Sequence, residues 1–221
     1  GSNEEAYLFQ KLIRTAFRSN NVDHCTRLCH ASSVAALMET IGSGAVTAPF
    51  TAAEDSDCII VIGARPTENH PVAATFLKAA AKRGAKLILM DPRGYALTRH
   101  ADHFLQFKPG TDVALLNAMM HTIVEENIVD AQYITDYTEG YDALRDSLAD
   151  FTPEAMSAVC GVDAETIRTV ARVYATSKRS IIFWGMGISQ SVHGTDNARC
   201  LISLALMTGQ VGRAGTGLHP L

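Results

Sequence analysis

Short apolar runs alternate along this chain with longer segments in which apolar residues recur every three or four positions. The short runs are rich in β-branched residues and predict strands buried on both faces, as is typical of parallel sheets. We expect four of them, at 57–63, 86–90, 103–107 and 180–185. The periodic segments predict amphipathic helices, and the clearest lie at 4–18, 72–83, 113–127, 164–176 and 195–208.

The order of these elements predicts the fold class. A strand, a polar loop, a helix, a glycine and a second strand follow one another from 57 to 90, which is the pattern of a βαβ unit. Only short helices and turns are expected between 130 and 161. The expected fold is therefore α/β: a doubly wound, mainly parallel, Rossmann-like sheet with helices on both faces and a helical insertion.

Two regions are expected along the chain. Residues 1–19 form a leading helix, and the first two residues, Gly1 and Ser2, look like a scar left by an expression vector. Residues 20–221 form one α/β domain, a size that supports a sizeable core. Because the leading helix starts without an entry strand before it, we expect the domain to be excised from a larger subunit.

Composition narrows the possible partners and the compartment. Of the 221 residues 47% are hydrophobic and 19% charged, and the net charge of −4 comes without a basic run. Nucleic acid is therefore not expected as a main partner. No apolar run approaches the roughly 20 residues of a membrane helix, so no membrane segment is expected in this chain. The five cysteines include no Cys-x-x-Cys pair, which favours free thiols and a cytoplasmic location.

Chemistry is most concentrated at 20–30, which holds two thiols, two imidazoles, an arginine and a carboxylate. Cys29 and His30 directly precede a predicted helix. A helix N-terminus favours anions, so we expect the Cys29 thiol to tend towards thiolate, the form that ligates metals and attacks electrophiles. The residues alone leave two interpretations open: a reactive or metal-ligating cysteine, and a buried free cysteine with no such role.

Ligands of open α/β sheets bind beyond the carboxyl ends of the strands, where four of the predicted loops lie. None contains Gly-x-Gly-x-x-Gly, so the usual nicotinamide fingerprint is absent. Carboxylates at strand ends can accept hydrogen bonds from a guanine edge or a ribose hydroxyl, and arginines can reach phosphates. Each loop taken alone could also be an ordinary turn. The candidate binding residues are Gly63, Ala64, Arg65, Pro66, Thr67, Glu68 and Asn69, then Asp91, Pro92 and Arg93, then Gly110, Thr111 and Asp112, and finally Met186, Gly187 and Gln190.

Asn-Asn-Val-Asp followed by Cys-x-Arg-x-Cys-His, at 20–30, resembles the segment around the molybdenum ligand in the catalytic subunit of formate dehydrogenases. These enzymes are molybdopterin-guanine-dinucleotide oxidoreductases. The four loops resemble the family's cofactor-contacting loops in the same order, and the resemblance runs from about residue 20 to 221. Arg65 is a departure, because asparagine is the common residue at its position.

The resemblance implies a function and a set of cofactors. Cys29 would bind molybdenum, or tungsten, in a bis-molybdopterin guanine dinucleotide cofactor, and the four loops would hold one dinucleotide arm. His30 would handle a proton or position formate, which is oxidised to carbon dioxide. A 4Fe-4S cluster would lie in the parent subunit outside this chain. Electrons would pass to iron–sulfur or flavin subunits of a larger complex, and the fragment alone would be inactive.

Other functions remain compatible with the same pattern. A nitrate reductase or another oxotransferase would keep the cofactor, although nitrate reductases tend to have methionine where this chain has His30. A non-catalytic electron-transfer scaffold would keep the fold without the metal, and the retained Cys29 argues against it. A plain nucleotide-binding module is disfavoured because Gly-x-Gly-x-x-Gly is missing.

Overall fold

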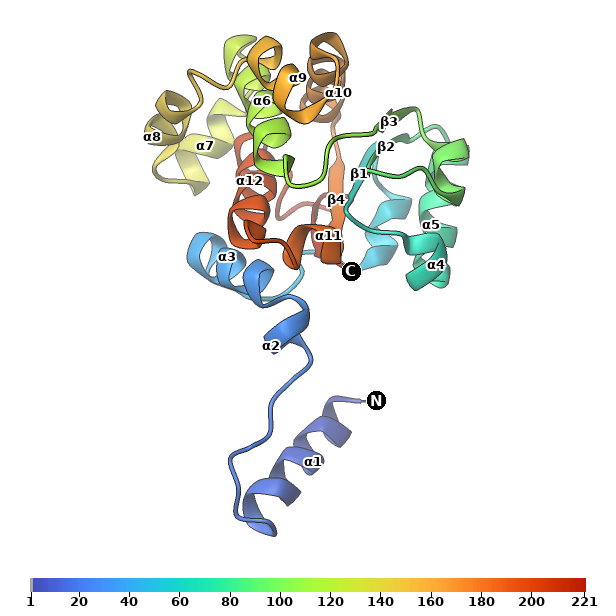
Figure 1. The fold of residues 1–221 in the computed structure, drawn as a ribbon, viewed down its shortest axis with the longest axis vertical. Helices are drawn as coiled ribbons and strands as arrows, with labels where there is room; N and C mark the ends of the chain where they lie inside the picture. The colour runs from blue at the N-terminus through green and yellow to red at the C-terminus, as the bar shows by residue number, and fades with distance from the viewer. Residues whose placement is uncertain (1) are drawn as a thin grey trace.

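The computed structural model describes residues 2–221 and is built around one parallel sheet (Figure 1). Within these residues the sheet has five strands in the order β3-β2-β1-β4-β5, and every neighbouring pair is parallel. Strand order reverses between β1 and β4, the position where doubly wound sheets open a crevice for ligands. The strands are β1 (Cys58–Ile62), β2 (Lys86–Met90), β3 (His103–Leu105), β4 (Ser180–Trp184) and β5 (Gly217–Pro220).

Helices cover both faces of the sheet, as the alternation of elements predicted (Figure 1). The short helices α7, α8 and α9 form the expected helical insertion between α6 and α10. Two 3-10 turns, η1 (Phe50–Glu54) and η2 (Ala96–His100), complete the connections. The helices are α1 (Asn3–Thr15), α2 (Thr26–Cys29), α3 (Ala31–Ile41), α4 (Pro66–Asn69), α5 (Pro71–Lys82), α6 (Asp112–Glu125), α7 (Ala131–Tyr137), α8 (Tyr141–Ser147), α9 (Pro153–Cys160), α10 (Ala164–Thr176), α11 (Met186–Ser189) and α12 (Gly194–Met207).

Alternate residues of the central strands face two separate cores. In β1, Ile60 and Ile62 pack with α3, α6, α10 and α12, while Ile59 and Val61 pack with α5 and the two 3-10 turns. All four side chains are almost fully buried. The β-branched run predicted to be buried on both faces is therefore confirmed, since each face of the strand has its own layer of helices.

The sequence pattern missed the edge strand β5, the 3-10 turns η1 and η2, and the four-residue helices α2, α4 and α11. β5 was read as a glycine-rich tail because Gly217 and Pro220 weaken the strand signal, but an edge strand tolerates proline and pairs here with β4 alone. The helices α4 and α11 were read as polar loops. Each is only four residues long, which is too short for a helical periodicity to be visible.

The leading helix α1 lies apart from the sheet and its helices (Figure 1). Ser2 and Glu5 form a capping box at its start, and none of its residues is buried. Ser2, predicted to belong to an expression scar, is thus the N-cap of α1, while Gly1 lies outside the described residues. None of the helices within residues 2–221 combines the length and the apolarity needed to cross a bilayer.

Candidate functional site

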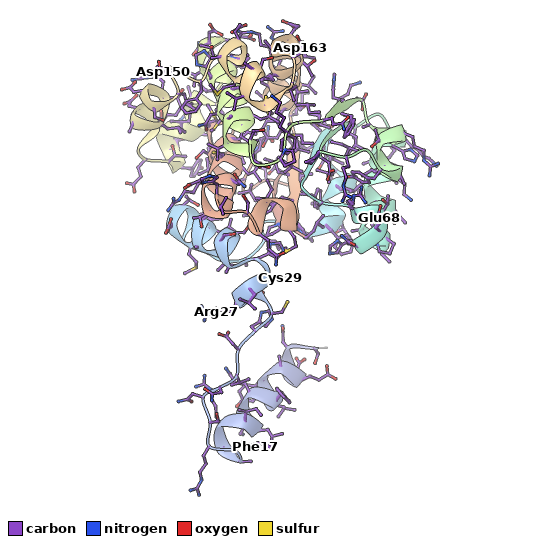
Figure 2. All side chains as sticks on the ribbon, viewed as in Figure 1. Phe17, Arg27, Cys29, Glu68, Asp150 and Asp163 are labelled. Atoms are coloured by element: carbon purple, nitrogen blue, oxygen red, sulfur yellow. The ribbon has the colours of Figure 1, made fainter. Side chains whose placement is uncertain are left out.

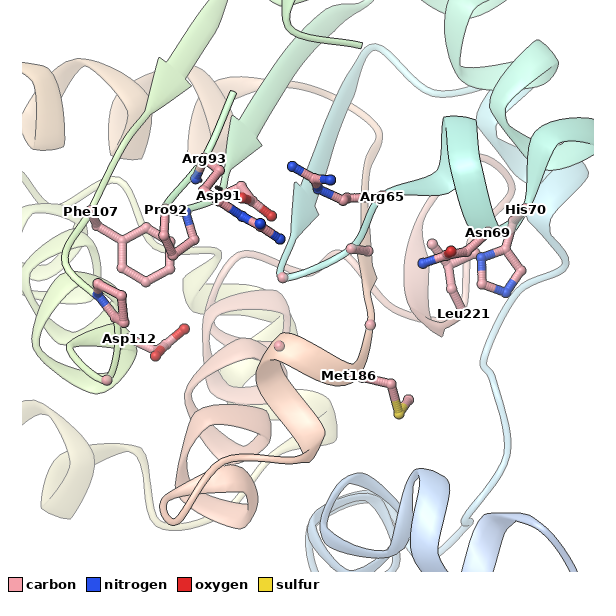
Figure 3. Close-up of a pocket in the computed structure, with 16 residues that line it drawn as sticks. Arg65, Asn69, His70, Asp91, Pro92, Arg93, Phe107, Asp112, Met186 and Leu221 are labelled. Atoms are coloured by element: carbon pink, nitrogen blue, oxygen red, sulfur yellow. Dashed lines mark hydrogen bonds between the residues drawn. The ribbon is translucent and has the colours of Figure 1, made fainter. Parts of the chain in front are cut away.

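A cavity of about 390 Å³ opens at the carboxyl ends of the strands, next to the reversal between β1 and β4 (Figure 3). Residues that follow all five strands line it, so the site is assembled from segments far apart in the chain. The lining residues are Gly63, Ala64, Arg65, Asn69, His70, Asp91, Pro92, Arg93, Phe107, Pro109, Gly110, Asp112, Gly185, Met186, Gly187 and Leu221.

The loops after β1 and β4 touch backbone to backbone beneath this cavity. Gly63 has a φ of +57°, and a Cβ built on it would lie 2.9 Å from the backbone nitrogen of Ile188. A Cβ on Gly187 would lie 2.8 Å from the Cα of Gly63. The N–H of Gly187 donates to the carbonyl oxygen of Gly63 over 3.0 Å. These glycines are therefore needed for the contact between the two loops that form the floor of the site.

Arginines and carboxylates alternate around the cavity. The Arg65 guanidinium lies 3.2 Å from a Glu68 carboxylate oxygen and 5.5 Å from the centre of the Tyr95 ring. Its Nε is buried without a hydrogen-bond partner within residues 2–221. Asp91 is buried, and one of its carboxylate oxygens accepts a hydrogen bond of 2.8 Å from the N–H of Arg93. The cavity thus offers both anion-binding and cation- or donor-binding groups.

Cys29 lies beside the cavity rather than in its wall. It is the last residue of α2, and its Sγ is 3.5 Å from the Sδ of Met186, which does line the cavity. Figure 2 shows Cys29 where the segment that carries α1 joins the body of the molecule. A hydrogen bond with the Cys25 thiol, followed by desolvation, raises the pKa of Cys29. The expected tendency towards thiolate is therefore contradicted by the raised pKa, whose first cause is the neighbouring Cys25 thiol.

His30 connects α2 to α3 and contacts two distant segments. Its Nδ1 lies 2.9 Å from the Ser189 hydroxyl of α11, and its Nε2 lies 2.7 Å from the carbonyl oxygen of Leu221. The imidazole is partly buried in both contacts. His30 therefore fixes the Cys29 segment to the two loops that follow β4 and β5.

A sequence model of the family described as molybdopterin oxidoreductase matches residues 1–221, the whole chain. The chain belongs to the molybdopterin oxidoreductase family. Among its curated relatives, the F420-dependent formate dehydrogenase subunit alpha of Methanocaldococcus jannaschii is 41% identical over 220 residues, which is 100% of this chain and 33% of that protein. Formate dehydrogenase H of Escherichia coli is 39% identical over 219 residues, covering 99% of this chain and 31% of that protein.

Two further proteins similar to this chain are named for reactions other than formate oxidation. A nitrate reductase of Synechocystis sp. is 33% identical over 216 residues, which is 97% of this chain and 30% of that protein. The solved structure of acetylene hydratase from Pelobacter acetylenicus superimposes with a TM-score of 0.76 and 26% identity, over 85% of this chain and 25% of that one. The chain thus spans about a third of the length of the curated relatives it matches.

The structure brings most of the sequence-predicted cofactor residues of this molybdopterin oxidoreductase into one cavity. Those that line it are Gly63, Ala64, Arg65, Asn69, Asp91, Pro92, Arg93, Gly110, Asp112, Met186 and Gly187. Those that lie outside its lining are Cys29, His30, Pro66, Thr67, Glu68, Thr111 and Gln190. Thr111, for example, is the N-cap residue of α6, but its hydroxyl donates to the carbonyl of Lys108 over 2.6 Å.

Five lining residues were not among those predicted: His70, Phe107, Pro109, Gly185 and Leu221. A signal existed for four of them, because they stand in or beside the loops singled out after the strands. Leu221 had no such signal, since the strand that precedes it was not recognised. Its position depends on the pairing of β5 with β4.

The cavity residues fit a molybdopterin, the cofactor that the molybdopterin oxidoreductase family implies. Phosphates need cationic donors, which Arg65 and Arg93 supply, and the unpartnered Nε of Arg65 leaves one donor free for a ligand. The N–H groups of a pterin need acceptors, which the buried Asp91 and Asp112 supply. For the metal, the Cys29 sulfur lies at the cavity margin, and a soft thiolate suits molybdenum or tungsten.

The burial of Asp112 predicts that its ionised carboxylate lowers the stability of the fold at pH 7. Only 5% of Asp112 is exposed, and desolvation raises the pKa of its carboxyl above the ordinary value. A carboxyl whose pKa is raised on folding stabilises the fold below its unfolded pKa and loses that contribution as pH rises through the folded value. Asp112→Asn is therefore expected to increase the free energy of unfolding at pH 7 by about 0.5–2 kcal/mol.

Urea denaturation at pH 7 and at pH 3.5 measures this effect of Asp112. The gain in midpoint is expected at pH 7 and should shrink at pH 3.5, where most of the wild-type carboxyl is protonated in both states. Asp150→Asn, a change of the same kind at an exposed position, is the control and should leave both midpoints unchanged. A lower midpoint for Asp112→Asn at pH 7 would show that the ionised carboxylate stabilises the fold.

Proposed function

We propose that this chain is the central cofactor-binding part of a molybdenum- or tungsten-dependent formate dehydrogenase. The observation that carries the proposal is the Cys29–His30 pair, held at the margin of a cavity that arginines and carboxylates line. The identity of about 40% to formate dehydrogenase subunits over the whole chain supports formate as the substrate. The family alone supports a molybdopterin cofactor; its guanine dinucleotide form is part of the proposal.

In this proposal each group of residues has a distinct task. When bound, the cofactor would supply the site that accepts the two electrons released as formate becomes carbon dioxide and a proton. Cys29 would ligate the metal, and His30 beside it would handle the proton or position formate. Arg65 and Arg93 would bind the phosphates, while Asp91 and Asp112 would accept hydrogen bonds from the guanine edge or a ribose.

The cavity explains why the metal ligand lies beside Met186. Met186 separates the Cys29 sulfur from the pocket that the β1, β2 and β4 loops form, and it is only partly buried. In this proposal the cavity residues would hold the nucleotide part of the cofactor and Cys29 would hold the metal, with the flexible and polarisable side chain of Met186 in contact with both the cavity and the Cys29 sulfur.

The larger assembly is proposed from the length of the relatives. Because the curated relatives are about three times as long as this chain, we propose that residues 20–221 are one domain of a larger subunit, with α1 leading into it. A 4Fe-4S cluster in that subunit, and iron–sulfur or flavin subunits beyond it, would carry the electrons away. The cysteines are free thiols throughout residues 2–221, which supports the proposal of a cytoplasmic location.

A nitrate reductase is the second candidate, because such an enzyme is 33% identical to this chain. The distinguishing experiment uses the full-length parent enzyme, purified from a host that makes the cofactor. We expect reduction of a viologen dye by formate and no oxidation of the reduced dye by nitrate. Nitrate consumption without formate oxidation would replace the proposed function with the second candidate, and an enzyme that lacks metal would favour a scaffold role.

A further inference from the structure

A chain of four hydrogen bonds, two of them buried and two partly buried, runs from the centre of the sheet through His30. It begins at the indole of Trp184 in β4, whose N–H donates to the hydroxyl oxygen of Ser33 over 2.9 Å. The Ser33 and Ser189 hydroxyl oxygens are 2.7 Å apart, and the Ser189 hydroxyl is 2.9 Å from His30 Nδ1. The last contact, of 2.7 Å, joins His30 Nε2 to the carbonyl oxygen of Leu221.

The two ends of this chain fix the direction of every hydrogen bond in it. An indole N–H can only donate, and a backbone carbonyl can only accept. His30 must therefore donate from Nε2 to Leu221, which leaves Nδ1 of the neutral ring as an acceptor for the Ser189 hydroxyl. Ser189 has then used its one proton, so Ser33 donates to Ser189 and accepts from Trp184. All four contacts are satisfied in one tautomer.

The alternative tautomer would leave one of these contacts unfavourable. With the proton on Nδ1, the Nε2 lone pair would face the carbonyl oxygen of Leu221 at 2.7 Å, so two acceptors would be in contact. An unpaired buried acceptor costs considerably more than a hydrogen bond contributes. Trp184 and Ser33 are completely buried, so water cannot compensate at that end of the chain, whereas the His30–Leu221 contact is partly buried. The protein thus selects the Nε2–H form of His30.

The turn that carries Ser189 is held rigidly. The hydroxyl of Ser32 donates to the carbonyl oxygen of Ser189 over 2.6 Å. The Asn197 amide donates to the carbonyl of Ile188 over 3.3 Å. Gly194 leaves no space on the other side, since a Cβ there would come within 2.7 Å of the Ser32 hydroxyl oxygen. The Ser189 hydroxyl is therefore fixed in place before any ligand binds.

We propose that Trp184, Ser33 and Ser189 are positioning residues that hold His30 as its Nε2–H tautomer, and that His30 thereby anchors the Cys29 segment instead of accepting a proton from formate. This inference rests on the proposed function for its substrate. Its physical basis is that Nδ1 accepts from the Ser189 hydroxyl while Nε2–H donates to Leu221, so neither ring nitrogen has a free lone pair.

The tautomer of His30 can be measured by NMR in the chain without its cofactor. In the 221-residue chain labelled with ¹⁵N-histidine, a two-bond ¹H–¹⁵N correlation spectrum at pH 8.5 distinguishes the two neutral tautomers. His30→Gln identifies the His30 signals among those of the eight histidines. We expect a protonated Nε2 and an unprotonated Nδ1 shifted by its hydrogen bond. A protonated Nδ1, or an equal mixture of the two tautomers, would overturn the proposal.

Variants of Ser189 test the chain itself. Ser189→Ala is expected to move the His30 Nδ1 signal to that of an unbonded nitrogen, and Ser189→Thr, which keeps a hydroxyl, to restore it. Ser191→Ala is the matched control, because its hydroxyl oxygen accepts only from the N–H of His193 in the same turn. If Ser189→Ala shifts the His30 signal no more than Ser191→Ala does, Ser189 does not position His30.

The role towards formate is measured in the full-length parent enzyme. Ser189→Ala is expected to raise the KM for formate about 3- to 10-fold with an unchanged metal content, the range that corresponds to loss of one hydrogen bond. A fall in kcat at constant KM would instead assign proton transfer to His30 and overturn the anchoring role. A parent enzyme that ignores formate would overturn the proposed function, while the tautomer found in the 221-residue chain would still stand.

Discussion

Cys29→Ser in the full-length parent enzyme is expected to abolish formate-dependent dye reduction, with a loss of at least about 100-fold. Changes of residues that merely support a metal ligand already cost about 10–100-fold, so removal of the ligand itself should cost more. A serine hydroxyl is a hard and weakly acidic donor and does not replace a soft thiolate. The sulfur that is lost lies 3.5 Å from Met186 at the cavity margin.

Metal analysis and activity together make this experiment decisive. The molybdenum or tungsten content of the purified variant should fall, or the metal should be bound without activity. Cys200→Ser is the control, because Cys200 is a partly buried thiol in α12 that donates to Asn117 and a serine hydroxyl keeps that bond. Full activity in Cys29→Ser would show that the metal is held by something other than this cysteine.

Gly63→Ala is expected to lower the free energy of unfolding of the chain by about 2–5 kcal/mol. Part of this cost is conformational, since an alanine at a φ of +57° is strained by about 1–3 kcal/mol. The remainder is steric, because the new Cβ would lie 2.9 Å from the backbone of Ile188 and 3.1 Å from Gly187. These atoms belong to a packed backbone and cannot turn away as a flexible side chain could.

Gly42→Ala measures the conformational part of this effect alone. The difference between the two variants then gives the steric part. Gly42 also has a positive φ, +73°, but nothing lies within 4 Å of the position its Cβ would take. Its substitution should cost only the conformational strain, about 1–2 kcal/mol. Urea denaturation midpoints compare the two variants. Equal costs for the two would mean that the loops after β1 and β4 separate freely, and the contact would then have no importance for the site.

The wrong pKa expectation for Cys29 and the unrecognised contact of Leu221 show which interactions a local sequence pattern cannot reveal. The thiol pKa was predicted to fall because a helix follows Cys29, yet the neighbouring Cys25 thiol raises it. Leu221 was unremarkable in the sequence, yet its carbonyl oxygen contacts His30 from 191 residues away. Both effects depend on which groups come within a few ångströms, and a contact at that distance leaves no periodic signal in the chain.

The sequence by itself determined the fold class, the parallel pairing and the edge of the sheet at which the site lies. It could do so because a strand buried on both faces must be apolar at every position, as β1 is, and because parallel strands place all their carboxyl ends together. It also singled out most residues of the cavity, since they directly follow those strands.

Only the tertiary structure decided how these residues act together. The edge strand β5 forms because β4 has a free row of backbone hydrogen-bonding groups with which it can pair. Its own residues Gly217 and Pro220 give no strand signal in the sequence. The need for glycine at 63 arises from the close approach of a loop more than 120 positions later. The hydrogen-bond direction that defines the His30 tautomer requires Trp184 and Leu221 at its two ends. Such features are set by distances between remote groups, and folding alone creates those distances.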